Sequence, residues 1–118
     1  MPRAFGPYIR RRREALVKDD PAFTVRQVAA RIGVEPSYLS KVERGHEAPP
    51  SEPRIRAIAA ELGEDPDVLL AIAGKVSADL QAIILRRPVL MAEIIRELKT
   101  LPEHAVVRIV RQVRDGKW

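Results

Sequence analysis

Apolar residues recur three and four positions apart through most of this 118-residue chain. That spacing places side chains on one face of an α-helix, whereas a half-buried strand needs strict apolar–polar alternation, and no stretch here sustains it. Glycine and proline fall between the apolar segments, where they end one helix and begin the next. The sequence therefore predicts an all-α fold.

Five helices are expected in the first part of the chain, at about residues 5–17, 24–33, 36–45, 51–63 and 65–74. Thr24 is expected to cap the second helix, with Gln27 completing a reciprocal capping box. Ser51 is expected to cap the fourth. The expected core-facing residues are Phe5, Ile9, Leu16, Val28, Ala29, Ile32, Ile55, Ile58, Ala59, Leu62, Val68, Leu69 and Ile72.

Three further helices are expected after Gly74, the first capped by Ser77 and the others starting at Pro88 and Pro102. The sequence thus predicts a domain over residues 1–74 and a C-terminal helical region over 75–118. Its apolar stripes exceed what three short helices can hide among themselves, so they should form both a small core and a dimer surface. The residues assigned to dimerisation are Leu90, Ile94, Leu98, Val106, Ile109, Val110 and Val113.

Positive charge is concentrated in one half of the chain. Residues 1–56 carry 12 Lys/Arg against 7 Asp/Glu, whereas residues 57–118 carry 9 of each. A basic half joined to a neutral, aliphatic half favours a polyanion-binding module attached to a packing module. The chain contains no cysteine, shows no membrane-spanning run and begins without a secretory signal, so we expect a cytoplasmic protein.

The segment from Thr24 to Gly45 has the features of two helices joined by a tight turn. Ala29 is small enough for close helix approach, and Gly33 permits the turn. Val34 should plug the turn into the core, while Leu39 and Val42 anchor the second helix. Ser37, Tyr38, Ser40, Lys41 and Arg44 are then left on the outer side, where such a helix can enter the DNA major groove.

These residues resemble the Xre/Cro family of helix-turn-helix repressors of phages and bacteria. The resemblance covers about residues 5–74 and is carried by Phe5–Arg10, Gly33–Gly45, Pro50–Ser51, Ile55–Gly63 and Asp65–Leu70. It implies a five-helix DNA-binding domain in which Arg13 and Glu43 form a structural ion pair. It also implies that Ser37, Tyr38, Ser40 and Lys41 read bases.

Phosphate contacts are expected from Arg10, Arg11, Thr24, Arg26, Arg44 and Arg54. Plainer interpretations remain open at several positions. The run from Arg10 to Arg13 is also typical of a solvated helix face, Lys41 of an ordinary surface lysine, and Tyr38 of packing against the second helix.

No enzyme is indicated. His46 and His104 lie far apart, and no metal-ligand spacing, glycine-rich phosphate loop or nucleophilic triad is present. We therefore expect no catalytic residues, metal or cofactor.

The sequence predicts a homodimeric transcriptional repressor that binds a palindromic operator in double-stranded DNA, with its own promoter a candidate target. The alternative is an antitoxin that binds a partner protein through its C-terminal helices and regulates itself by binding DNA. Nothing in the sequence identifies the operator, the regulated genes, the inducing signal or the sign of regulation.

Overall fold

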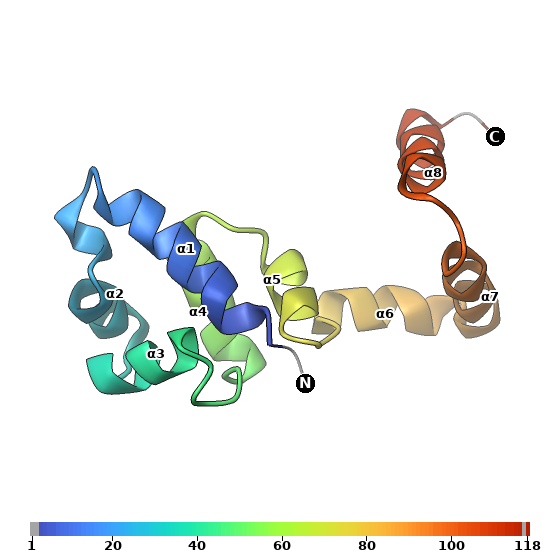
Figure 1. Cartoon of the computed structure of the whole chain (residues 1–118). Coiled ribbons are helices and arrows are strands. Elements are labelled where there is room, and N and C mark those ends of the chain that lie inside the picture. The colour runs from blue at the N-terminus through green and yellow to red at the C-terminus, as the bar shows by residue number, and fades with distance from the viewer. Residues whose placement is uncertain (1–2, 117) are drawn as a thin grey trace. The chain divides into compact units, whose positions relative to one another are not determined.

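The structure, a computed structural model, describes residues 3–116 and 118. Within them it contains α-helices, one short 3₁₀ helix and no strand, so the all-α prediction is confirmed. The elements in chain order (Figure 1) are α1 (Phe5–Val17), η1 (Pro21–Phe23), α2 (Val25–Ile32), α3 (Pro36–Glu43), α4 (Glu52–Leu62), α5 (Pro66–Ile72), α6 (Ala78–Arg86), α7 (Pro88–Leu98) and α8 (Glu103–Asp115).

The chain divides into two compact units, Met1–Leu80 and Gln81–Trp118. The boundary falls inside α6. In the first unit, α1 packs on α3 and α4, α2 packs on α3 and α4, and α4 packs on α5. The core between these helices consists of Phe5, Ile9, Val28, Ala29, Ile32, Leu39, Val42, Ile55, Ile58, Ala59, Leu62, Leu69, Leu70 and Ala73.

The residues expected to face the core in α1, α2 and α4 are buried, apart from Leu16, which is half-buried and packs against the core. The stripe predicted for α5 is wrong at Val68, although Leu69 is buried and Ile72 packs against the core as expected. Val68 is 51% exposed, whereas Leu70 and Ala73 are buried together with Leu69. The buried face is therefore displaced by one residue, because a seven-residue helix spans only two turns and several apolar stripes fit its sequence equally well.

Local hydrogen bonds fix the start of α2. Thr24 Oγ1 accepts from the Gln27 backbone N–H at 3.2 Å, as a capping residue should. The Thr24 N–H, which a capping box would give to the Gln27 side chain, instead donates to the carbonyl of Pro21 at 3.4 Å. That bond closes η1, which lies between the helices expected at 5–17 and 24–33.

Two other capping expectations had different outcomes. Ser51 stands at the N-cap of α4 but makes no side-chain capping hydrogen bond. Ser77 is buried, and its Oγ accepts from the Leu80 N–H at 3.1 Å. The start of α6 is also held within the first unit, where Ala78 N–H donates to Glu52 Oε2 at 3.3 Å and Arg56 Nη2 lies 3.4 Å from Asp79 Oδ2.

The second unit has a different character. None of its described residues from Gln81 onward is buried. Large apolar side chains lie in solvent along α7 and α8, among them Leu90 (61% exposed), Ile94 (46%) and Val113 (65%). Among the described elements, the extensive contacts are all made within the group of helices that runs from α1 to α5 along the chain. Most of the apolar residues of α7 and α8 therefore remain exposed, whereas Leu98, Val106 and Ile109 are half-buried.

Candidate nucleic-acid interface

Helix α3 has one buried face and one exposed face. Leu39, Val42 and Glu43 are buried, whereas Ser37, Lys41 and Arg44 are exposed. The last three are spaced four and three residues apart, which aligns them on one side of a helix. The burial pattern therefore fixes the rotation of α3 about its axis and turns a polar, cationic stripe outward.

The turn before α3 sets its direction. Gly33 adopts a left-handed conformation (φ 77°), which glycine tolerates at no steric cost. Val34 N–H then donates to the Ala29 carbonyl at 3.0 Å, and the Val34 side chain packs against the core. Pro36 begins α3 at a position where no N–H is needed. Figure 1 shows α2 and α3 following one another through this turn.

The four residues predicted to read bases differ in exposure. Ser37 and Lys41 are exposed, whereas Tyr38 and Ser40 are half-buried. The Tyr38 side chain packs against the core, and packing against the second helix, whose Val28 and Ala29 belong to that core, stays the plainer interpretation. Lys41 makes no ion pair with any described residue. Its ammonium group is therefore free to meet an acceptor outside the protein.

A buried ion pair ties α3 to α1. Arg13 Nε lies 2.7 Å from Glu43 Oε2, and Nη2 lies 2.9 Å from Oε1, so the contact is bidentate. Arg13 Nη1 also donates to the carbonyl of Phe23 at 3.1 Å. The hydrogen bonds with Glu43 raise the pKa of the Arg13 guanidinium. The structure thus brings together the two residues for which the family resemblance implies an ion pair. The Arg13 side chain alone links α1, η1 and α3.

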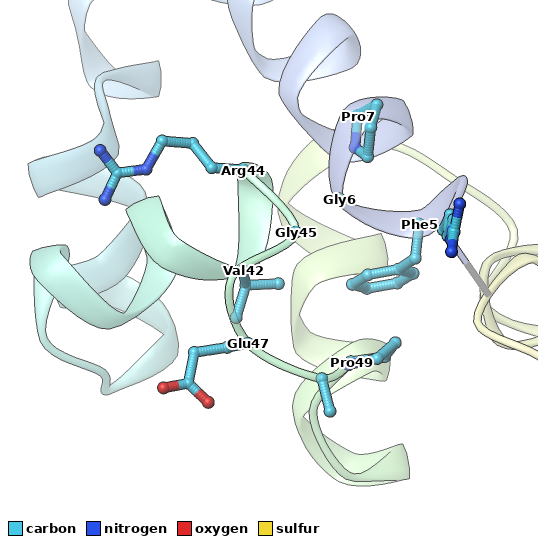
Figure 2. A pocket seen from close by; sticks show the side chains of 10 residues that line it. Phe5, Gly6, Pro7, Val42, Arg44, Gly45, Glu47 and Pro49 are labelled. Atoms are coloured by element: carbon cyan, nitrogen blue, oxygen red, sulfur yellow. The ribbon is translucent and has the colours of Figure 1, made fainter. Parts of the chain in front are cut away.

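Gly6 marks a close approach between α1 and α3, a role that no local sequence pattern indicated. A Cβ atom at this position would lie 2.3 Å from the Val42 carbonyl oxygen and 2.9 Å from that of Glu43. Figure 2 shows Gly6 facing the chain from Val42 to Gly45. A side chain here would push the C-terminal end of α3 outward, so glycine keeps the exposed stripe of α3 in place.

The residues predicted to contact phosphate are distributed as follows. Arg11, Arg26 and Arg44 are exposed and make no ion pair with any described residue. Arg10 is exposed and pairs with Glu14, with Nε 2.7 Å from Oε1. Thr24 is exposed, and its hydroxyl caps α2.

Arg54 is the exception among them. Its Nη1 donates to the carbonyls of Ile32 (2.7 Å) and Gly33 (3.0 Å), at the C-terminal end of α2. This arginine extends from α4 to satisfy backbone acceptors that a helix end leaves without partners. The geometry gives Arg54 a contact inside the domain, and its phosphate contact stays a prediction.

A hollow of about 300 Å³ lies where the start of α1 meets the loop after α3 (Figure 2). Arg3 and Arg44 give its rim positive charge, and Glu47 gives negative charge. Its lining consists of Arg3, Phe5, Gly6, Pro7, Val42, Arg44, Gly45, Glu47, Ala48 and Pro49. Arg44 lines this hollow, and in Figure 2 its side chain extends away from Phe5.

No cluster of three His, Cys, Asp or Glu side chains in residues 3–116 and 118 could hold a metal ion. In the same part of the chain, no helix combines the length and apolar character needed to cross a bilayer.

Comparison with known proteins gives one match. The family described as a helix-turn-helix domain matches residues 4–71, more than half of the chain. No curated protein and no solved structure matches the chain. The matched segment contains α1 to α4 and nearly all of α5, including the exposed stripe of α3 and the Arg13–Glu43 pair.

Proposed function

Because this chain belongs to the helix-turn-helix domain family of DNA-binding proteins, we propose that it is a sequence-specific transcriptional regulator of the Xre/Cro type. It acts as a homodimeric repressor on a roughly palindromic operator, by covering a promoter, with its own promoter a candidate. It binds DNA and catalyses no reaction.

The observation that carries this proposal is the two-sided burial of α3. Leu39, Val42 and the Arg13–Glu43 pair hold the inner face, which leaves Ser37 and Lys41 directed outward on a rigid element. A lysine on such a helix can donate to guanine O6 and N7 in the major groove, and Ser37 can reach either a base or a phosphate.

The cationic surroundings support affinity for the DNA backbone. Arg11, Arg26 and Arg44 are exposed within the matched segment. Neutralising phosphates releases counterions, so these residues supply binding that weakens with salt and is largely independent of sequence. Sequence preference then comes from α3, and the two contributions can be separated by experiment.

The first experiment selects bound sequences from random duplex DNA with the full chain, and then measures the mass of the complex on the selected site. We expect an inverted repeat with half-sites about one helical turn apart, bound by two copies of the chain. Recovery of no preferred sequence would contradict the proposed regulator, and a single asymmetric site bound by one copy would contradict the homodimer.

Replacing Lys41 with alanine tests the base-reading role. We expect Lys41→Ala to weaken binding to the selected operator by about 1–3 kcal/mol and to relax the preference at one base pair in each half-site. Competition binding against operators with single substitutions measures both effects.

Arg26→Ala is the matched comparison, since it removes a cation from an exposed position of α2. It should weaken binding to all sequences alike and reduce the salt slope by about 1. Lys99→Ala, outside the matched segment, should change neither property. Unaltered operator binding by Lys41→Ala would remove Lys41 from the base-reading set.

A second candidate function is an antitoxin that neutralises a partner protein through α7 and α8 and regulates itself through DNA. The exposed apolar side chains of these helices favour some protein partner. Co-purification of a small protein in fixed stoichiometry, together with loss of the homodimer, would support this candidate over the simple repressor.

A further inference from the structure

The apolar groove on α7 is the surface whose occupant can be inferred. Leu90, Met91 and Ile94 line it, and Glu93 and Glu97 stand along its edge. Leu90 and Ile94 are 61% and 46% exposed. The described residues of the second unit contain no buried side chain. Ordering such a segment costs conformational entropy that its own contacts do not offset, so α7 requires a cover.

Helix α8 carries the complementary pattern. Val107 and Val110 are 37% and 48% exposed. Arg111 and Arg114 follow each of them by four residues, so the valines and arginines share one ridge of the helix. On α7 the two carboxylates are four residues apart, and on α8 the two guanidiniums are three apart. Each pair therefore spans about one helical turn, and the two edges match in charge and spacing.

These four charges are unpaired within residues 3–116 and 118. Glu93, Glu97, Arg111 and Arg114 form no ion pair with another described residue. The extensive contacts between described helices also do not include α8 on α7. The groove and its complementary ridge thus exist on the same polypeptide without covering each other, which is the arrangement expected when the cover comes from a second copy.

We propose that the α7 groove of one copy receives α8 of a second copy, with Glu93 and Glu97 facing Arg111 and Arg114 of that copy. This inference rests on the proposed homodimer and names its interface. A two-fold axis repeats the contact, because α8 of the first copy then enters the α7 groove of the second. The repetition doubles the buried surface, and specific interfaces bury roughly 1,200 Å² or more in total.

Charge reversal on the full chain tests the pairing. The variants Glu93→Arg/Glu97→Arg and Arg111→Glu/Arg114→Glu each place like charges across the interface. Each should raise the dimer dissociation constant by about tenfold or more. The variant with all four substitutions restores opposite charges and should return the constant to near the wild-type value. Sedimentation velocity over a concentration series measures this constant.

Arg96→Glu is the matched control, because Arg96 is exposed and lies two residues from Ile94, on the side of α7 away from the groove. It reverses a charge on the same helix as Glu93 and Glu97 and should leave the dimer intact. Circular dichroism on every variant identifies loss of helix, and recovery in the fourfold variant excludes simple unfolding as the cause of dissociation.

Several results would overturn the inference: a monomeric wild-type chain, double variants that dimerise as well as the wild type, a fourfold variant that fails to recover, or a wild-type chain isolated in stable complex with a different protein. The proposed function fails separately. A wild-type dimer with the expected charge pairing that selects no DNA sequence contradicts the regulator but leaves the interface standing.

Discussion

Gly6 shows how one residue sets the position of a neighbouring helix. In an open helix, replacing glycine with alanine gains about 1 kcal/mol from backbone entropy. Here the added Cβ would meet the Val42 carbonyl at 2.3 Å, and the backbone cannot rotate aside as a side chain would. We expect Gly6→Ala to destabilise the protein by about 1–3 kcal/mol, as measured by chemical denaturation.

The control for this substitution is Ala60→Gly at an exposed position of α4. It measures the glycine–alanine difference without a close contact and should cost about 1 kcal/mol. A Gly6→Ala variant at least as stable as the wild type would show that α1 and α3 can separate without cost at this point.

Tyr8 gives the first unit a dependence on alkaline pH. Its hydroxyl donates to Glu64 Oε1, which joins α1 to the segment between α4 and α5. This hydrogen bond, with smaller contributions from burial and from the Glu64 charge, raises the pKa of Tyr8 above its ordinary value of 10.0. The neutral phenol is therefore favoured in the folded state, and its contribution is fully present below the unfolded pKa.

That contribution should be lost as the pH rises through the folded pKa of Tyr8. Wild-type protein should lose stability relative to Tyr8→Phe between about pH 9 and about pH 12, whereas the difference between them should stay constant at lower pH. Urea denaturation of both proteins across this range measures the difference, in which lysine titration common to both cancels. If the difference in stability between the two proteins is the same at every pH, the Tyr8–Glu64 hydrogen bond does not give the protein a dependence on alkaline pH.

At the scale of elements, Arg54 connects α4 to the end of α2. Its hydrogen bonds to Ile32 and Gly33 close the turn that precedes α3. We expect Arg54→Met to lower the free energy of unfolding by about 1–2 kcal/mol, since charged hydrogen bonds are lost, and to leave the salt slope of DNA binding unchanged.

Arg26→Met is the contrast for Arg54→Met. We expect it to reduce the salt slope of DNA binding and to leave the free energy of unfolding unchanged. The two measurements are a urea titration and operator affinity over a series of salt concentrations. If Arg54→Met reduces the slope and keeps its stability, then Arg54 contacts phosphate as the sequence predicts, and its bonds to α2 contribute little.

The elements that could be predicted from sequence are those specified by local signals. The span predicted for α1, 5–17, is the observed one, and the cap at Thr24 and the left-handed Gly33 lie where they were expected, because periodicity, capping and turn preferences act within a few residues. The same signals correctly directed Leu39 and Val42 inward, which sets the outward face of α3.

What could not be predicted depends on short elements or on distant contacts. The three residues of η1 are too few to show a period. The stripe of α5 is ambiguous over two turns, which explains the exchange of Val68 for Leu70. The close approach at Gly6 and the bonds of Arg54 join residues more than twenty positions apart, so no neighbouring residue indicates them.

At the scale of the whole molecule, the two units should differ in the source of their stability. The first unit is held by its own core around Phe5, Ile9 and Ile55, whereas the described residues of α7 and α8 contain no buried side chain. If a second copy covers these helices, their protection from hydrogen exchange depends on protein concentration by mass action.

Amides of α1 to α5 should exchange at a rate independent of protein concentration. Hydrogen exchange is measured by mass spectrometry at protein concentrations above and below the dimer dissociation constant. In the wild type, exchange in α7 and α8 alone should be slower at the higher concentration. The Glu93→Arg/Glu97→Arg variant should show fast exchange in these helices at both concentrations. Equal protection of α7 and α8 at both wild-type concentrations would mean that these helices are stable without a partner.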